Sequence, residues 1–243
     1  MLDAHAHLSA VPARGDGWLV PGVDAQTDGE ARTHGADGRV WRAVGLHPWF
    51  LDGDLEAKLT ALEARVTADV VAIGETGLDA MRRAGPRDRQ ERAFRAQIRL
   101  ALARDLPLVL HVVRRHGACL DLLAEEGFLE EGSSAPAAPS EGPPACAPRP
   151  RGMVHDFGGP AEMIGPWVDA GFCLSISPRS VVKEHRRAIV AAIPAHALLI
   201  ETDDFGPERL SDVAAWVSGA RGVPVGQLTA QTDANLRRLV GAR

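Results

Sequence analysis

Short apolar runs recur along the chain, and segments of helical length lie between them. The runs are continuous stretches of Val, Ile, Leu and Ala rather than alternating ones, which is typical of parallel strands covered by helices. Eight strands are predicted, at residues 1–5, 18–23, 40–46, 70–74, 106–112, 152–155, 172–176 and 198–201. Helices are predicted at residues 54–68, 87–104, 117–126, 160–170, 183–192, 208–220 and 226–240.

The alternation of strands and helices predicts a parallel sheet. A unit of about 30 residues fits eight times into 243 residues, which is the size of a TIM (β/α)8 barrel. We therefore predict an α/β fold of this kind, somewhat irregular in the first units, where residues 26–38 are poorly patterned. Residues 130–150 contain six prolines among Ala, Ser and Gly, which predicts a flexible surface insert within a single domain spanning 1–243.

The composition excludes several classes of protein. No apolar run approaches the ~18 residues of a membrane span, and nothing at the N-terminus is typical of a signal peptide, so we expect a cytoplasmic protein. Cys119, Cys146 and Cys173 form no C-x-x-C pair, which argues against a disulfide framework or a cysteine zinc site. The net charge of −5 offers no basic surface for tight duplex binding, so any contact with nucleic acid must be local.

Residues of metal-binding type follow the predicted strands. His5 and His7 point to one face of the first strand because successive side chains alternate, and neutral imidazole suits Zn, Cu, Fe or Ni. The active site of a (β/α)8 barrel gathers at the C-terminal ends of its strands. At those ends the chain also places His47, Glu75, His111, His155 and Asp203. We expect these side chains to surround one cavity.

Five segments in this order resemble the signatures of the TatD family of metal-dependent hydrolases: residues 3–8 (DAHAHL), 44–48 (VGLHP), 73–79 (IGETGLD), 154–159 (VHDFGG) and 199–203 (LIETD). The resemblance covers nearly the whole chain apart from the proline-rich insert. It implies a TIM barrel of the amidohydrolase superfamily that uses two divalent cations. Many members of this family are described as deoxyribonucleases, often with 3′ to 5′ exonuclease activity.

The resemblance also implies two sets of ligands that share Glu75: His5, His7, Glu75 and Asp203 for one cation, and Glu75, His111 and His155 for the other. A carboxylate between two cations offsets their repulsion, and a water held there has a lowered pKa. Asp203 is then both a ligand and the base that orients or deprotonates this water, although Asp is also a favoured helix cap. Glu201 is a candidate to hold the remaining N–H of a histidine.

Two departures from the family concern the substrate. Most relatives have an arginine where this chain has Val113, and Arg114, Arg115 or His116 could bind the substrate anion instead. Residues 204–207 lead almost directly into a helix, where relatives have a longer loop that walls the pocket. His47 is predicted to touch a substrate phosphate, with a structural turn histidine as the alternative. Trp49 could stack a base or simply pack.

We therefore predict a metal-dependent phosphodiesterase that acts on DNA ends or short oligonucleotides. The same centre would also suit an ester or amide hydrolase, such as an aminoacyl-tRNA deacylase or a small-molecule amidohydrolase, and a non-enzymatic binding protein is the third reading. The ligand types suit Zn, Mn, Fe or Ni, or Mg with more water. We expect a monomer that needs no membrane and no obligate protein partner.

Overall fold

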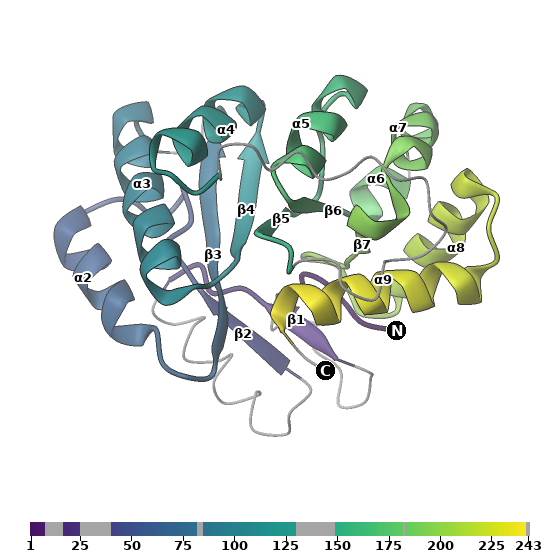
Figure 1. The fold of residues 1–243 in the computed structure, drawn as a ribbon, viewed down its shortest axis with the longest axis horizontal. Helices are drawn as coiled ribbons and strands as arrows, with labels where there is room; N and C mark the ends of the chain where they lie inside the picture. Colours follow the sequence, from purple (N-terminus) through teal and green to yellow (C-terminus); the bar gives the residue numbers. More distant parts are fainter. Residues whose placement is uncertain (8–16, 25–39, 82–84, 130–148, 182, 242–243) are drawn as a thin grey trace.

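The computed structural model describes residues 1–7, 17–24, 40–81, 85–129, 149–181 and 183–241. Seven parallel strands form one sheet in chain order, and the sheet curls inside a ring of helices (Figure 1). The strands are β1 (Trp18–Val20), β2 (Val40–Val44), β3 (Val70–Asp79), β4 (Leu108–Val113), β5 (Gly152–Val154), β6 (Phe172–Ile176) and β7 (Leu198–Ile200). The predicted α/β barrel is confirmed.

The N-terminal segment connects the two edges of this sheet. The predicted strand at residues 1–5 forms isolated parallel bridges, Asp3 with Trp18 and Ala6 with Asp203, rather than a continuous strand. The backbone N–H of Ala4 donates to the carbonyl of Ile200 (3.1 Å), and that of Ala6 donates to Leu19 (3.1 Å). The segment therefore occupies the place of an eighth strand between β7 and β1.

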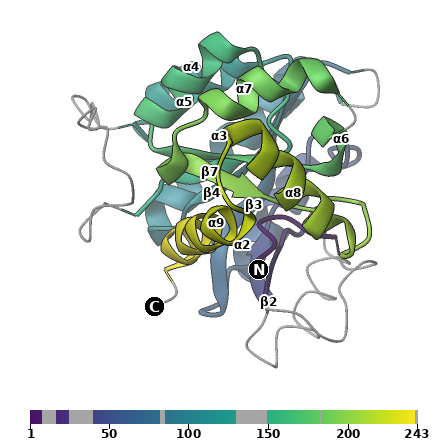
Figure 2. The same ribbon diagram turned by 90° about the vertical axis from the view of Figure 1, so that its right-hand side faces the viewer.

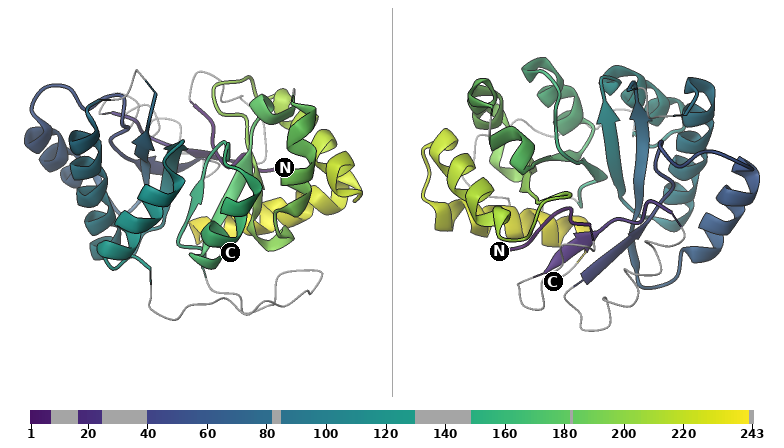
Figure 3. Two further views of the ribbon diagram at one scale, coloured as in Figure 1. Left: turned by 90° about the horizontal axis from the view of Figure 1, so that it is seen from above. Right: turned by 180° about the vertical axis from the view of Figure 1, so that it is seen from behind.

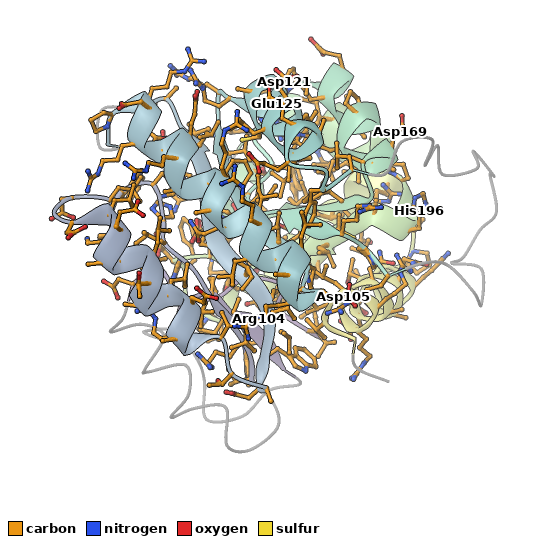
Figure 4. All side chains as sticks on the ribbon, turned by 60° about the vertical axis from the view of Figure 1, so that its left-hand side comes forward. Arg104, Asp105, Asp121, Glu125, Asp169 and His196 are labelled. Carbon is orange, nitrogen blue, oxygen red and sulfur yellow. The ribbon has the colours of Figure 1, made fainter. Side chains whose placement is uncertain are left out.

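Helices lie outside the sheet, as the view from above shows (Figure 3). They are α2 (Leu55–Arg65), α3 (Arg87–Arg104), α4 (His116–Glu125), α5 (Ile164–Asp169), α6 (Pro178–Val181), α7 (Arg187–Ala192), α8 (Arg209–Arg221) and α9 (Val225–Val240), with 3-10 turns at Ala161–Met163, Glu184–Arg186 and Ala195–Ala197. Polar side chains such as Asp121, Asp169 and His196 are exposed on the outer surface (Figure 4). No helix among the described residues is long and apolar enough to cross a bilayer.

The interior of the sheet is filled by one apolar side chain from each strand. These are Leu19, Ala43, Ala72, Val109, Met153, Cys173 and Leu199, all at most 2% exposed. Leu236 and Leu239 of α9 pack against this layer, and α9 runs beside the chain termini (Figure 2). Because this end is closed by apolar packing, polar side chains that point inward lie beyond the layer, toward the C-terminal ends of the strands.

Strand β3 is longer than the predicted 70–74 because two glycines let it approach β4 closely. Gly74 and Gly77 have φ angles of 154° and 139°, and a Cβ on either would lie within 2.5 Å of a β4 carbonyl oxygen. Glu75 and Asp79 therefore both lie within the strand. The predicted insert, 130–150, lies outside the described residues except for its last two positions.

Candidate metal centre

The six residues predicted as ligands lie together at the C-terminal ends of the strands. The N-terminal segment carries His5 and His7, β3 carries Glu75, and β4 carries His111. The other two, His155 and Asp203, directly follow β5 and closely follow β7. Five of the six are at most 9% exposed, and His7 is partly exposed. The structure therefore brings the predicted residues together, while their binding of metal stays a prediction.

One group of ligand atoms has the spacing of a cation site. The Nε2 atom of His5 lies 3.5 Å from Oε2 of Glu75 and 4.0 Å from Oδ1 of Asp203. The Nε2 atom of His7 lies 3.5 Å from the same Oδ1 and 3.9 Å from Oε2 of Glu75. Two ligand atoms on one tetrahedral ion lie about 3.3–3.6 Å apart. The four distances are therefore longer than those of hydrogen bonds and close to the distance between two ligand atoms that bind the same ion.

His5 shows directly that this group fits a cation. Its imidazole is fully buried, and neither ring nitrogen has a hydrogen-bond partner among the described residues. Leaving a buried polar nitrogen without a partner costs about 1–3 kcal/mol. A cation between Nε2 of His5 and the carboxylates of Glu75 and Asp203 would satisfy one of these nitrogens.

The second group surrounds the other oxygen of Glu75. Its Oε1 atom lies 2.8 Å from Nε2 of His155, 3.0 Å from Nδ1 of His111 and 3.2 Å from Nε2 of His47. The two nitrogens of His111 and His155 are also only 3.0 Å apart. Glu75, His111 and His47 satisfy the spacing of a metal-binding group, so His47, which the sequence analysis counted among residues of metal-binding type but assigned to the substrate, is also a candidate ligand. Its predicted contact with a substrate phosphate stays a prediction.

The charges of this cluster are mutually dependent. Burial disfavours the protonated imidazole of His155, but the carboxylates of Glu75 and Glu201 outweigh it and raise its pKa well above the usual value. Burial likewise opposes the charge on Glu75, yet the surrounding imidazoles hold its pKa well below the usual value. Burial lowers the pKa of His47 despite the nearby carboxylate. The carboxylate of Glu75 is therefore the negative centre of the site.

Three buried carboxylates orient the histidines from behind. Asp79 accepts hydrogen bonds from Nε2 of His111 (2.9 Å) and from Nε1 of Trp49 (2.7 Å). Glu201 lies 3.6 Å from Nδ1 of His155, an ion-pair distance beyond hydrogen-bond range, and accepts from the backbone N–H of Asp156 (2.7 Å).

Asp3 is the third, and it accepts hydrogen bonds from the backbone of His5 and from Thr202, which joins the N-terminal segment to β7. Burial raises the pKa of Asp3 to about 7. Glu201 lies near His155 at an ion-pair distance, so its predicted hydrogen bond to the N–H of a histidine stays a prediction, whereas Asp79 was missed. Asp79 could have been predicted from its position four residues after Glu75, because residues 75, 77 and 79 share one face of a strand.

The residues predicted to bind the substrate anion after β4 have other contacts. His116 is buried at the start of α4, its Nδ1 accepts from Nε1 of Trp167 (3.0 Å), and burial lowers its pKa to about 4. Arg115 pairs with Glu91 (3.2 Å). Arg114 has a φ of 57° where the chain leaves β4. A role of these residues in substrate binding stays a prediction without a supporting contact.

Arg179 is a residue of the site that the sequence analysis missed. It lies in α6, after β6, and its Nη2 atom donates to Oδ2 of Asp203 (2.9 Å) and of Asp204 (3.2 Å). Its Nε atom lies 3.4 Å from Oδ2 of Asp156. Burial raises the pKa of Asp203, but the histidines around it outweigh this and lower it below the usual value. No periodic signal marks Arg179, because it follows a strand that carries no other charged residue.

A parallel barrel with buried histidine and carboxylate clusters at the C-terminal ends of its strands is the arrangement of a metal-dependent hydrolase. The chain belongs to the TatD family: the family model described as TatD related DNase matches residues 2–241.

Relatives agree with this membership, and a solved structure agrees with the fold. The 3′-5′ ssDNA/RNA exonuclease TatD of Citrobacter koseri is 32% identical over 226 residues, which cover 83% of this chain and 78% of that protein. The exonuclease of the same name from Yersinia pseudotuberculosis is 31% identical over 252 residues, 92% of this chain and 87% of that protein. A TatD homologue from Escherichia coli superimposes with a TM-score of 0.82 at 23% identity, covering 100% of this chain and 98% of that one.

Proposed function

We propose that this protein is a divalent-metal-dependent phosphodiesterase that removes nucleotides from the 3′ ends of single-stranded DNA or RNA. The observation that carries this proposal is the placement of Glu75, whose two oxygens face two different sets of ligands. Oε2 faces His5 and His7, whereas Oε1 faces His111 and His155. Membership in the TatD family, with relatives named as exonucleases, supports the reaction class.

Each residue of the centre has a distinct role in this proposal. His5, His7 and Asp203 would hold one cation, His111 and His155 would hold the other, and Glu75 would serve both. Cations held there would polarise the phosphoryl group and make a water molecule acidic enough to attack it at neutral pH. Asp203 orients the water and accepts its proton through Oδ1, the oxygen that faces the imidazoles. Asp79 fixes the ring orientation of His111 by a hydrogen bond, and the carboxylate of Glu201 faces Nδ1 of His155 at 3.6 Å.

Two exposed aromatic side chains near the proposed centre favour single-stranded nucleic acid as the substrate. Trp49 and Phe205 are 41% and 36% exposed, although large apolar side chains are usually buried. The ring of Trp49 lies 5.8 Å from that of His111, and its N–H is held by Asp79. Phe205 lies two residues after Asp203, which belongs to the other proposed ligand set, that of His5 and His7. Exposed rings on both sides of the centre can stack the bases of a splayed strand but not those of an intact duplex.

The test is the hydrolysis of a single-stranded DNA 20-mer labelled at its 5′ end, with added Mn²⁺ or Mg²⁺. The account predicts a ladder that shortens from the 3′ end, abolished by EDTA, and slower loss from a blunt duplex. Asp203→Asn should keep its cations and lose turnover by about 10²- to 10⁴-fold, the usual loss for a general base. His185→Ala is the surface control, because His185 is an exposed histidine in the 3-10 turn Glu184–Arg186. This variant should behave as the wild type.

Two results would overturn the proposal. Hydrolysis of p-nitrophenyl acetate without release of any mononucleotide from DNA or RNA would assign the centre to carboxylic esters instead. Full turnover by Asp203→Asn would return this residue to a purely structural role.

A further inference from the structure

Arg179 stands at the point where the proposed metal centre meets solvent. Its side chain is 44% exposed, while Asp203, which it contacts, is only 5% exposed. The two oxygens of Asp203 are divided between partners, because Oδ1 faces His5 and His7 and Oδ2 accepts from Arg179. Among the described residues, Arg179 is the arginine within ion-pair distance of a proposed ligand.

The guanidinium group of Arg179 is held in place from several sides. Asp156, Asp203 and Asp204 lie within 3.4 Å of its nitrogens, and its carbon Cζ lies 5.4 Å from the centre of the Phe205 ring. Its backbone N–H donates to Oγ of Ser177 (3.1 Å), which in turn donates to Asp156. The positive charge of Arg179 is shared among three carboxylates. Its guanidinium group is planar and carries paired N–H donors that match the oxygens of a phosphate.

Two of the three cationic candidates predicted after β4 have partners of their own. Arg115 pairs with Glu91, and His116 is buried against Trp167. Val113, two residues after His111, is apolar.

We infer that Arg179 binds the phosphate of the nucleotide being released, and so selects anionic phosphodiesters over neutral esters at this centre. This inference rests on the proposed function and names its substrate-binding residue. In the structure Arg179 donates a hydrogen bond to Oδ2 of Asp203. Metal binding by Asp203 would weaken its pairing with Arg179, and the donors of Arg179 would then be available to the non-bridging oxygens of the phosphate. Cζ of Arg179 lies over the Phe205 ring, 5.4 Å from its centre.

The probes are thymidine 5′-monophosphate, inorganic phosphate and thymidine, each titrated by calorimetry into metal-loaded protein. The variants are Arg179→Ala, Arg179→Lys and the control Arg187→Ala. Arg187 is a matched control because it is similarly exposed (41%), pairs with one carboxylate, that of Glu184, and lies over a ring, that of Trp216 (5.6 Å), outside the centre. Metal content and thermal unfolding are measured on the same samples.

Arg179→Ala should weaken both phosphate-containing probes by about 10- to 100-fold, the range for lost charge-assisted hydrogen bonds, with metal content unchanged. Binding of thymidine should stay the same in every variant. Arg179→Lys should recover part of the loss, since it keeps the charge but not the paired donors. Arg187→Ala should bind all three probes as the wild type does.

The inference is overturned if Arg179→Ala binds the monophosphate as tightly as the wild type. It is also overturned if the loss disappears when the variant is saturated with metal, because Arg179 would then only position Asp203. Weak binding of phosphate by the wild type itself would refute this inference, whereas the proposed function is tested separately by the release of nucleotides from a strand. If the wild type binds phosphate through Arg179 but releases no nucleotide from any strand, Arg179 is a phosphate-binding residue of the centre and the exonuclease proposal fails.

Discussion

Glu75→Gln removes the negative charge from the middle of the centre while keeping nearly the same shape. The carboxylate is 2% exposed and lies within 3.9 Å of five imidazole groups, those of His5, His7, His47, His111 and His155. Breaking a buried charge pair by removing one partner costs about 3–5 kcal/mol. At 1.4 kcal/mol per tenfold, this corresponds to a loss of metal affinity of about 10²- to 4 × 10³-fold. The loss should fall on both sites because each oxygen faces one ligand set.

The assay is competition for Zn²⁺ with a chromophoric chelator, at fixed pH, together with metal analysis of the dialysed protein. Glu63→Gln on α2 is the matched control, because that side chain is 66% exposed and has only a distant partner, Arg104 at 3.8 Å. The control should keep the affinity of the wild type. Equal affinity of Glu75→Gln and the wild type would refute the placement of a cation on either oxygen of Glu75.

Three further predictions follow from other parts of the structure. Gln97→Met removes the hydrogen-bond partners of both the N–H and the carbonyl of Leu46 (2.8 and 3.1 Å). It should therefore destabilise the protein by about 2–4 kcal/mol and lower the Tm by about 5–15 °C, whereas Gln227→Met, at an exposed position, should change the Tm little. Unchanged calorimetric unfolding of Gln97→Met would contradict this prediction. The carboxylates raise the pKa values of His7, His111 and His155 against burial, so a larger fraction of these imidazoles carries a proton at a given pH, and a cation must displace those protons. Calorimetry in buffers of different protonation enthalpy should show proton release at pH 7, and metal binding should weaken as the pH falls. A heat independent of buffer would count against this prediction. The predicted insert of 130–150 is not dispensable at its end, because Arg149 donates to the carbonyl of Leu239 (2.9 Å) and Pro150 is buried. Replacing only residues 130–148 with a short Gly/Ser linker should leave the Tm and the metal content nearly unchanged, since their composition offers little to bury. A drop of many degrees would show that they pack on the barrel.

The sequence analysis succeeded where residue type and strand order decide the structure. His5, Glu75, His111 and His155 were predictable because the ends of parallel strands meet at one mouth and because few other residue types suit a cation. The helix at Arg87–Arg104 was predicted to the residue, since its apolar face and its flanking Pro86 and Asp105 bound it clearly. Strand β3 was predicted too short because the approach of its glycines to β4 depends on a tertiary contact.

The residues that the sequence did not reveal are placed by contacts between distant segments. Arg179 meets Asp203 across 24 positions of the chain, and Asp79 meets His111 across 32. His116 has the same residue type as the ligands and lies five positions after His111, yet the packing of α4 against Trp167 turns its ring into a buried contact. Residue type and spacing therefore indicated the kind of centre, whereas packing determined which neighbouring side chains face it.

The most direct test of the metal centre is anomalous diffraction from crystals of this protein soaked in Mn²⁺. The account predicts two peaks, one bound by His5, His7 and Asp203 and the other by His111 and His155, each about 2.0–2.3 Å from its ligand atoms and each contacting one oxygen of Glu75. Cations bound elsewhere, with no peak within ligand distance of Glu75 at saturating Mn²⁺, would contradict the account.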